Sequence, residues 1–145
     1  MFSDPIKATG RLHIELVGAD GKLVEARDVS NLVVTAGLTH LAARAVGSPT
    51  AMSHMAAGTG ATAAALGNTT LGTEIGRVAL TSAVSSVNTI VYTATFGPGV
   101  ATGSITELGV FNASSSGTML ARTVFAALVK DSLMTLTVTW TVTLN

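Results

Sequence analysis

The clearest alternation of apolar and polar positions lies at the C-terminal end of the chain. From Met134 to Leu144 every even position is apolar, and every odd position from 135 to 143 is threonine. Successive side chains of a strand point to opposite faces, so residues 133–144 are predicted to form a β-strand with one apolar and one hydroxyl face. Trp140 lies on the apolar face. The rest of the chain is expected to cover that face.

Alternation with the same period recurs upstream. Residues 11–16 and 22–29 are predicted to form a hairpin around a turn at 18–21, where Asp-Gly suits a tight turn. The return strand is the most charged piece of the chain and is therefore expected to be exposed or at a sheet edge. A long loop is expected over 61–76, and the nearly continuous apolar run at 118–129 is expected to be buried on both faces or at an interface. The remaining predicted strands cover 53–57, 77–86, 88–96, 104–112 and 118–129.

One helix is predicted, within residues 31–47. Thr35 is a candidate N-cap, and the apolar positions Leu38, Leu41, Ala42 and Ala45 recur at three- and four-residue spacing. This apolar stripe is expected to lie on the sheet or to close one end of a barrel.

These elements predict an all-β protein, an antiparallel β-sandwich or jelly roll of about eight strands with one short helix. Residues 1–9 show no periodicity and contain Pro5, so they are expected to form an extended N-terminal arm. Residues 10–145 are expected to form a single β-sandwich domain.

The composition favours a component of a larger assembly. Charged residues make up 11% of the chain, the formal net charge is zero and 48% of residues are hydrophobic. A weakly charged surface offers little repulsion against association. The balanced charge and the 4% of aromatic residues give no indication of nucleic-acid binding. No run approaches the length of about 20 apolar residues that a membrane span needs, so no membrane partner is expected.

Candidate chemistry is sparse. The chain has no cysteine, which excludes disulfides and thiolate metal sites. His13, His40 and His54 show no ligand spacing and are interpreted as surface or hydrogen-bonded histidines. The turn 58–60 lacks the lysine of a phosphate-binding loop, and no Gly-x-Ser-x-Gly nucleophile motif occurs. No metal or cofactor is expected.

Two carboxylates lie in otherwise uncharged surroundings and are the only candidates for acid–base catalysis, Glu74 and Glu107. The simpler interpretation makes Glu74 a loop carboxylate and Glu107 a partner for Arg77 or Arg122 on a neighbouring strand. We therefore expect a protein that is not an enzyme, with no catalytic, cofactor-binding or metal-binding residues.

Four segments carry a resemblance to a known group of proteins: Gly58-Thr59-Gly60, residues 71–77 (LGTEIGR), residues 105–112 (ITELGVFN) and residues 119–125 (MLARTVF). Together with residues 31–38 (NLVVTAGL), they resemble small structural proteins of tailed bacteriophages. Within that group the chain is most similar to the capsid cement, or decoration, proteins, a family represented in a Bordetella short-tailed phage. The resemblance covers most of the chain from residue 31 onward.

This resemblance implies a jelly-roll fold and dimers that clamp neighbouring subunits of the major capsid protein. The expected partners are a second copy of the chain and that capsid protein, and the expected location is the outer surface of the virion after synthesis in the bacterial host cytoplasm. A cement protein needs contact area rather than reactive groups, which agrees with the apolar composition. The alternative is a tail-fibre or baseplate module that binds a receptor or another tail protein.

Overall fold

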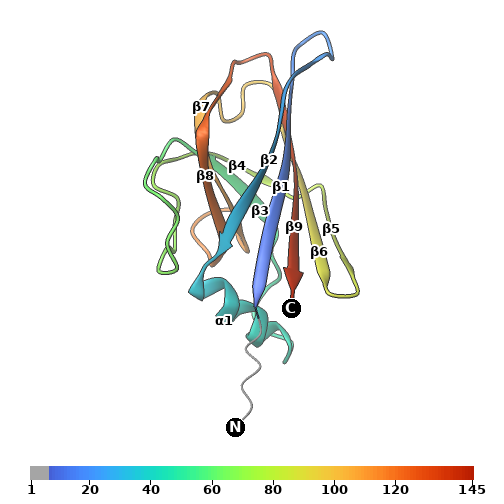
Figure 1. The fold of residues 1–145 in the computed structure, drawn as a ribbon, viewed down its shortest axis with the longest axis vertical. Helices are drawn as coiled ribbons and strands as arrows, with labels where there is room; N and C mark the ends of the chain where they lie inside the picture. Colours follow the sequence, from blue (N-terminus) through green and yellow to red (C-terminus); the bar gives the residue numbers. More distant parts are fainter. Residues whose placement is uncertain (1–6) are drawn as a thin grey trace.

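The computed structural model describes residues 7–145 and confirms an all-β, antiparallel protein with one short helix (Figure 1). Nine strands form one curled sheet in the order β4-β3-β7-β8-β2-β1-β9-β6-β5, and every neighbouring pair is antiparallel. In chain order the elements are β1 (Ala8–Val17), β2 (Leu23–Val33), α1 (Thr35–Arg44), β3 (His54–Gly58), β4 (Glu74–Ala79), β5 (Ser82–Ser86), β6 (Thr89–Phe96), β7 (Gly103–Phe111), β8 (Met119–Lys130) and β9 (Thr135–Leu144).

The two ends of the sheet are joined directly by the chain. The single strand predicted over 77–86 is wrong, because the chain breaks at Leu80 and Thr81 and forms β4 and β5 at opposite ends of the strand order. Leu80 N–H donates to the Ser53 carbonyl beside β3, whereas Thr81 N–H donates to the Thr93 carbonyl on β6. Leu80 is therefore bonded to the β4–β3 end of the sheet, and the next residue, Thr81, is bonded to the β6–β5 end. Two adjacent residues can reach both ends only if the sheet curls.

Residues 22–29 are exposed or half-buried, as predicted, although β2 is not at an end of the strand order. It lies between β1 and β8, but only Leu32 and Val33 pair with β8. Further along, Arg27 closes the gap by donating to the backbone carbonyls of Ala126 and Ala127. A guanidinium thus takes the place of ladder hydrogen bonds where the two strands diverge.

The core lies inside the curl. Trp140 on β9 is completely buried, opposite Leu12 on β1 and Tyr92 on β6. The opposite side of the core comes from β3, β7 and β8, with Met55, Leu108 and Leu120 fully buried. The alternation of β9 therefore assigns its apolar face correctly. The apolar run of β8 is buried from Met119 to Thr123, but the following residues are mixed, so it is buried over only part of its length.

The helix lies within the predicted range, but its N-cap and its main contact with the sheet differ from the prediction. Residues 31–33 belong to β2, and Val34 rather than the predicted Thr35 occupies the N-cap. No side chain within residues 7–145 caps the helix, and the Thr35 N–H donates to the Leu66 carbonyl. Gly37 is buried against β8, and a Cβ at this position would lie only 2.1 Å from the Leu120 carbonyl oxygen, so the helix can pack this closely only with glycine. Of the predicted apolar stripe, Leu41 packs against the core, whereas Leu38 remains 37% exposed.

The predicted arm, residues 1–9, lies mostly outside the described residues. The described part contradicts the predicted boundary: β1 begins at Ala8, which pairs with Leu144, and Lys7 exchanges backbone hydrogen bonds with Asn145. Backbone hydrogen bonds to the long strand β9 hold these residues in a strand, although their sequence shows no alternation of apolar and polar positions.

Candidate functional site

The most elaborate polar centre in the described chain surrounds Glu107 on β7. Its carboxylate is fully buried and accepts backbone N–H groups from Gly60 at 2.6 Å, Gly72 at 2.8 Å and Thr73 at 2.8 Å. Arg122 on β8 donates to the same carboxylate from Nη2 at 2.9 Å and from Nε at 3.1 Å. Of the two partners predicted for Glu107, Arg122 pairs with it, whereas Arg77 pairs with Glu74. The three backbone donors come from a loop that sequence reasoning did not connect to it.

These contacts hold the loop at residues 59–73, which joins β3 and β4. Arg122 Nη1 also donates to Asn68 Oδ1 in that loop, and the Thr106 hydroxyl donates to the Gly60 carbonyl. A Cβ on Gly60 would lie 2.4 Å from the Glu107 carboxylate, so the close approach requires glycine. The four segments that carry the phage resemblance thus meet around one carboxylate, which we call the Glu107 clamp.

The electrostatics of the clamp favour a structural role for Glu107. Burial alone would raise the pKa of the carboxyl, but hydrogen bonds from Thr73, Gly72, Gly60 and Arg122 outweigh it and lower the pKa below its ordinary value. The group is therefore ionised at neutral pH. A carboxylate with both oxygens occupied by donors is poorly placed to exchange a proton with a substrate.

Glu74, the second candidate, does not join Glu107. It lies on edge strand β4 and forms a bidentate pair with Arg77 at 2.7 and 3.0 Å. Arg77 also donates to the carbonyls of Ala113 and Ser116 and lies 3.9 Å from the centre of the Phe111 ring. The two carboxylates belong to separate structural contacts rather than to one catalytic pair.

The three histidines lie on different elements and do not form a common site: His13 is on β1, His40 on α1 and His54 on β3. His13 is exposed on β1, with Nε2 3.0 Å from Glu15 and Nδ1 3.0 Å from Asp28, and its hydrogen bonds to these carboxylates raise its pKa. His54 contacts the Ser53 hydroxyl. His40 on α1 differs from the prediction of a surface or hydrogen-bonded histidine, because it is buried and its Nδ1 has no hydrogen-bond partner among the described residues. Burial, together with Arg44, lowers its pKa. Among residues 7–145 no group of three or more His, Cys, Asp or Glu could hold a metal ion.

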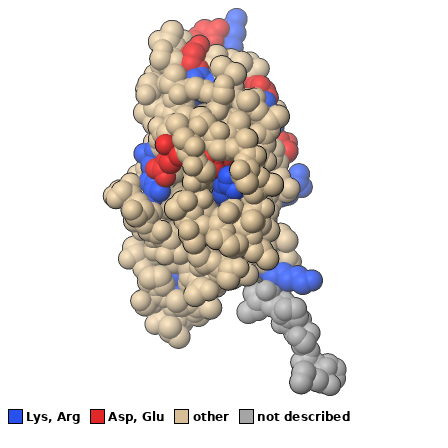
Figure 2. Space-filling view, turned by 90° about the vertical axis from the view of Figure 1, so that its left-hand side faces the viewer, with Lys and Arg blue, Asp and Glu red and all other residues tan. Residues whose placement is uncertain are grey.

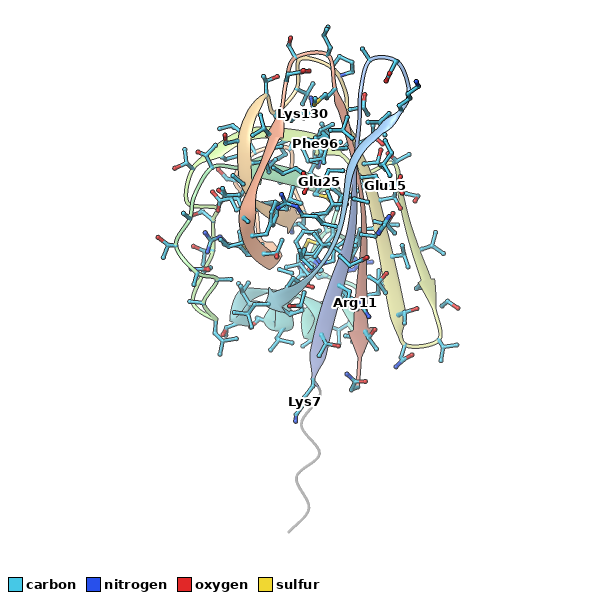
Figure 3. The ribbon with its side chains drawn as sticks, turned by 45° about the horizontal axis from the view of Figure 1, so that its top comes forward. Lys7, Arg11, Glu15, Glu25, Phe96 and Lys130 are labelled. Atoms are coloured by element: carbon cyan, nitrogen blue, oxygen red, sulfur yellow. The ribbon has the colours of Figure 1, made fainter. Side chains whose placement is uncertain are left out.

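A buried lysine was missed by the sequence analysis. Lys130, the last residue of β8, is fully buried, and its Nζ donates to the Gly97 carbonyl at 2.9 Å, beside Phe96 (Figure 3). Burial lowers its pKa, and Asp131 only partly offsets that effect. The signal in the sequence was the register of β8, which places residue 130 on the same face as Leu128.

We predict that Lys130→Met is at least as stable as the wild type at neutral pH, because methionine fills a similar space without burying a charge. The lowered pKa means that the unfolded state binds more protons below the ordinary value of 10.5, so wild-type stability should rise as the pH approaches that value. This rise should be missing in the variant. Urea unfolding of the wild type and the variant, at neutral pH and at a pH just below 10.5, measures the change in stability. A strongly destabilised variant at neutral pH would contradict the prediction.

A regular surface made almost entirely of threonine forms the outward face of β6 and β9, which we call the threonine face. Its members alternate with core residues along the two strands, and all are half-buried except Thr95, which is exposed: Thr89, Val91, Thr93, Thr95, Thr135, Thr137, Thr139, Thr141 and Thr143. At its border with β1, residues including Arg11, His13, Thr139 and Thr141 line a shallow depression of about 330 Å³. Figure 3 shows Arg11 and Glu15 on the neighbouring strand β1.

Charged side chains are sparse over the molecule in general. Figure 2 shows a different side of the protein, on which a few acidic and basic groups are scattered among uncharged ones. None of the helices in the described part of the chain is long and apolar enough to cross a membrane.

Comparisons with known proteins leave the family open. No family model, no curated protein and no solved structure matches this chain.

Proposed function

We propose that this chain is a non-enzymatic structural protein of a virion, a cement protein that binds the major capsid protein on the outside of the shell and stabilises it as a dimer. The observation that carries the proposal is the threonine face, a regular surface without charged side chains on either of its two strands. The sequence resemblance to phage structural proteins supplies the biological context.

Threonine suits a surface that is buried on assembly. Each side chain offers a methyl group for packing and a hydroxyl group that can donate and accept a hydrogen bond. Its β-branched side chain has few rotamers, so little conformational entropy is lost when a partner covers it. Lysine or glutamate at these positions would add both an entropic cost and the cost of desolvating a charge.

The Glu107 clamp supports the same role. It fixes the 59–73 loop to β7 and β8 through charge-assisted hydrogen bonds, which are stronger than neutral ones. A protein that bridges neighbouring capsid subunits must transmit force without local opening. A rigid loop and a curled sheet closed by the chain meet that requirement.

The direct test is binding to tailed-phage shells assembled without this chain. We predict that wild-type protein sediments with the shells and that Thr139→Arg, which adds a long charged side chain to the threonine face where β9 borders β1, weakens binding at least about tenfold. The matched control is Ser115→Arg in the exposed loop between β7 and β8, which should bind as the wild type does. Equal binding of Thr139→Arg and wild type would contradict the use of this face.

The depression beside Arg11 favours the second candidate, a tail-fibre or baseplate module that binds a receptor. Threonine hydroxyls together with Arg11 and Asp28 could hydrogen-bond a polar ligand such as a glycan. This candidate predicts a stable trimer and glycan binding, with no binding to shells. The sedimentation experiment therefore separates the two.

A further inference from the structure

The edge strand β5 lacks the protection that sheet edges normally carry. All five of its residues, Ser82 to Ser86, are exposed, and Val84 is 59% exposed. It pairs with β6 on one side only, as the last strand of the sheet. Exposed edges are commonly blocked by charges, proline or a bulge, because their free N–H and C=O groups can pair with another chain. β5 has no charge and no proline, and its register with β6 shows no bulge.

The other end of the sheet differs. Edge strand β4 carries Glu74 and Arg77, which pair with one another. By contrast, no Lys, Arg, Asp or Glu occurs between Arg77 and Glu107, a stretch that includes β5 and β6. The protein therefore has one charged edge and one uncharged edge, and only the latter is open to pairing without a cost in desolvated charge.

The turn after β5 gives a second, independent observation. Val87 has a φ of 54° and a fully exposed side chain. The left-handed region is unfavourable for a β-branched residue, and glycine or asparagine is the usual occupant of such a hairpin turn. The turn therefore holds an exposed apolar side chain beside the uncharged edge, where a second chain that pairs with β5 would contact it.

We infer that β5 pairs antiparallel with β5 of a second copy of this chain across a two-fold axis. A strand edge is its own complement under this symmetry, since each N–H meets a C=O of the same segment in the other copy. Both edges are uncharged, so the two copies meet without repulsion. The inference rests on the dimer in the proposed function and names the surface that forms it.

A register centred on Val84 satisfies the geometry. It places Val84 opposite Val84 of the second copy, Ser82 opposite Ser86, and Val87 beside Thr81. Val84 points to the same side of the sheet as Val91 and the threonine face, because the two residues are direct partners in the β5–β6 ladder. The dimer therefore joins the two threonine faces into one continuous uncharged surface, twice as wide as that of a single copy.

Cysteine cross-linking tests the register, because the natural chain has no cysteine. Directly opposite residues of an antiparallel pair have Cα atoms about 4.5 or 5.5 Å apart, within the range of about 4.4–6.8 Å that a disulfide spans. Val84→Cys should form a covalent dimer under mild oxidation at low protein concentration. Leu133→Cys, at a similarly exposed position (62%) in the turn between β8 and β9, should not.

A charge variant tests the same surface without a covalent bond. Light scattering after size-exclusion chromatography should give a dimer for the wild type and for Leu133→Lys, and a monomer for Val84→Lys, in which two like charges would face each other. Circular dichroism should show that all variants are folded. A wild-type monomer at every concentration, or a wild-type dimer that Val84→Lys leaves intact and Val84→Cys does not cross-link, would overturn the inference.

Binding to shells separates this inference from the proposed function. Wild-type protein that is monomeric in solution yet binds shells would overturn the β5 pairing and leave the cement role standing. A β5-linked dimer that does not bind shells would support the pairing and overturn the cement role.

Discussion

Replacing Glu107 by glutamine is expected to lower the free energy of unfolding by about 3–5 kcal/mol, the loss found when one partner of a buried ion pair is removed. Each carboxylate oxygen faces two groups that donate hydrogen bonds. One oxygen accepts from Gly72 and Arg122, and the other accepts from Gly60 and Thr73. The glutamine amide would therefore point an NH₂ group at a donor in either orientation. Arg122 would also keep a buried charge without a counter-ion.

Urea unfolding of Glu107→Gln and Glu74→Gln, followed by circular dichroism, measures this effect. Glu74→Gln is the matched control because its carboxylate is partly exposed and paired with Arg77, so it should cost under about 1 kcal/mol. Similar losses in the two variants would show that the Glu107 clamp does not hold the fold.

The Glu107 carboxylate should also make the free energy of unfolding depend on pH in the acidic range. Because the pKa of Glu107 is lower in the folded chain than its ordinary value of 4.5, its contribution is complete above that value and is lost as the pH falls through the folded pKa. Glu107→Gln should unfold with a weaker dependence on pH over that range. The 59–73 loop should be the first part of the wild-type chain to lose protection from hydrogen exchange.

The second large effect is expected at Trp140, where Trp140→Ala should cost about 3–5 kcal/mol. The ring is completely buried at the centre of the core, between Leu12 on β1 and Tyr92 on β6. Truncation removes its apolar contacts and leaves a cavity, because the strands on both sides cannot collapse into the space. Thermal unfolding of the variant measures the loss.

Thr137→Ala on the same strand is the control. Thr137 points outward between Glu15 and Thr95, so its replacement should cost under about 1 kcal/mol in the isolated protein. A wild-type melting temperature for Trp140→Ala, or a larger loss for Thr137→Ala, would show that the two faces of β9 are assigned wrongly.

The period of the sequence was enough to predict which residues of β1 and β9 face the core. In β9 the contrast between apolar residues and threonine is complete, so the burial of Trp140 followed from residue order alone. The break at Leu80 and Thr81 could not be predicted in the same way, because the alternation runs almost through it. Only pairing with β3 on one side and β6 on the other divides that segment.

The Glu107 clamp shows a different limit of sequence reasoning. Charge and strand pairing were enough to narrow its partner to Arg77 or Arg122, but not to choose between them. The donors at Gly60, Gly72 and Thr73 come from a loop without periodicity. The sequence signal was the glycines, which stand where a Cβ would collide with the carboxylate or the opposing backbone. Distant glycines reveal a common centre only when their positions in space are known.

The cement role is tested most directly by the melting temperature of shells assembled without this chain, measured before and after saturation with the purified protein. A bridging protein binds the assembled shell better than its dissociated subunits, so it should shift the equilibrium toward the shell by mass action. The account predicts a higher melting temperature with wild-type protein and a smaller increase with Thr139→Arg. An unchanged melting temperature at saturating protein would contradict it.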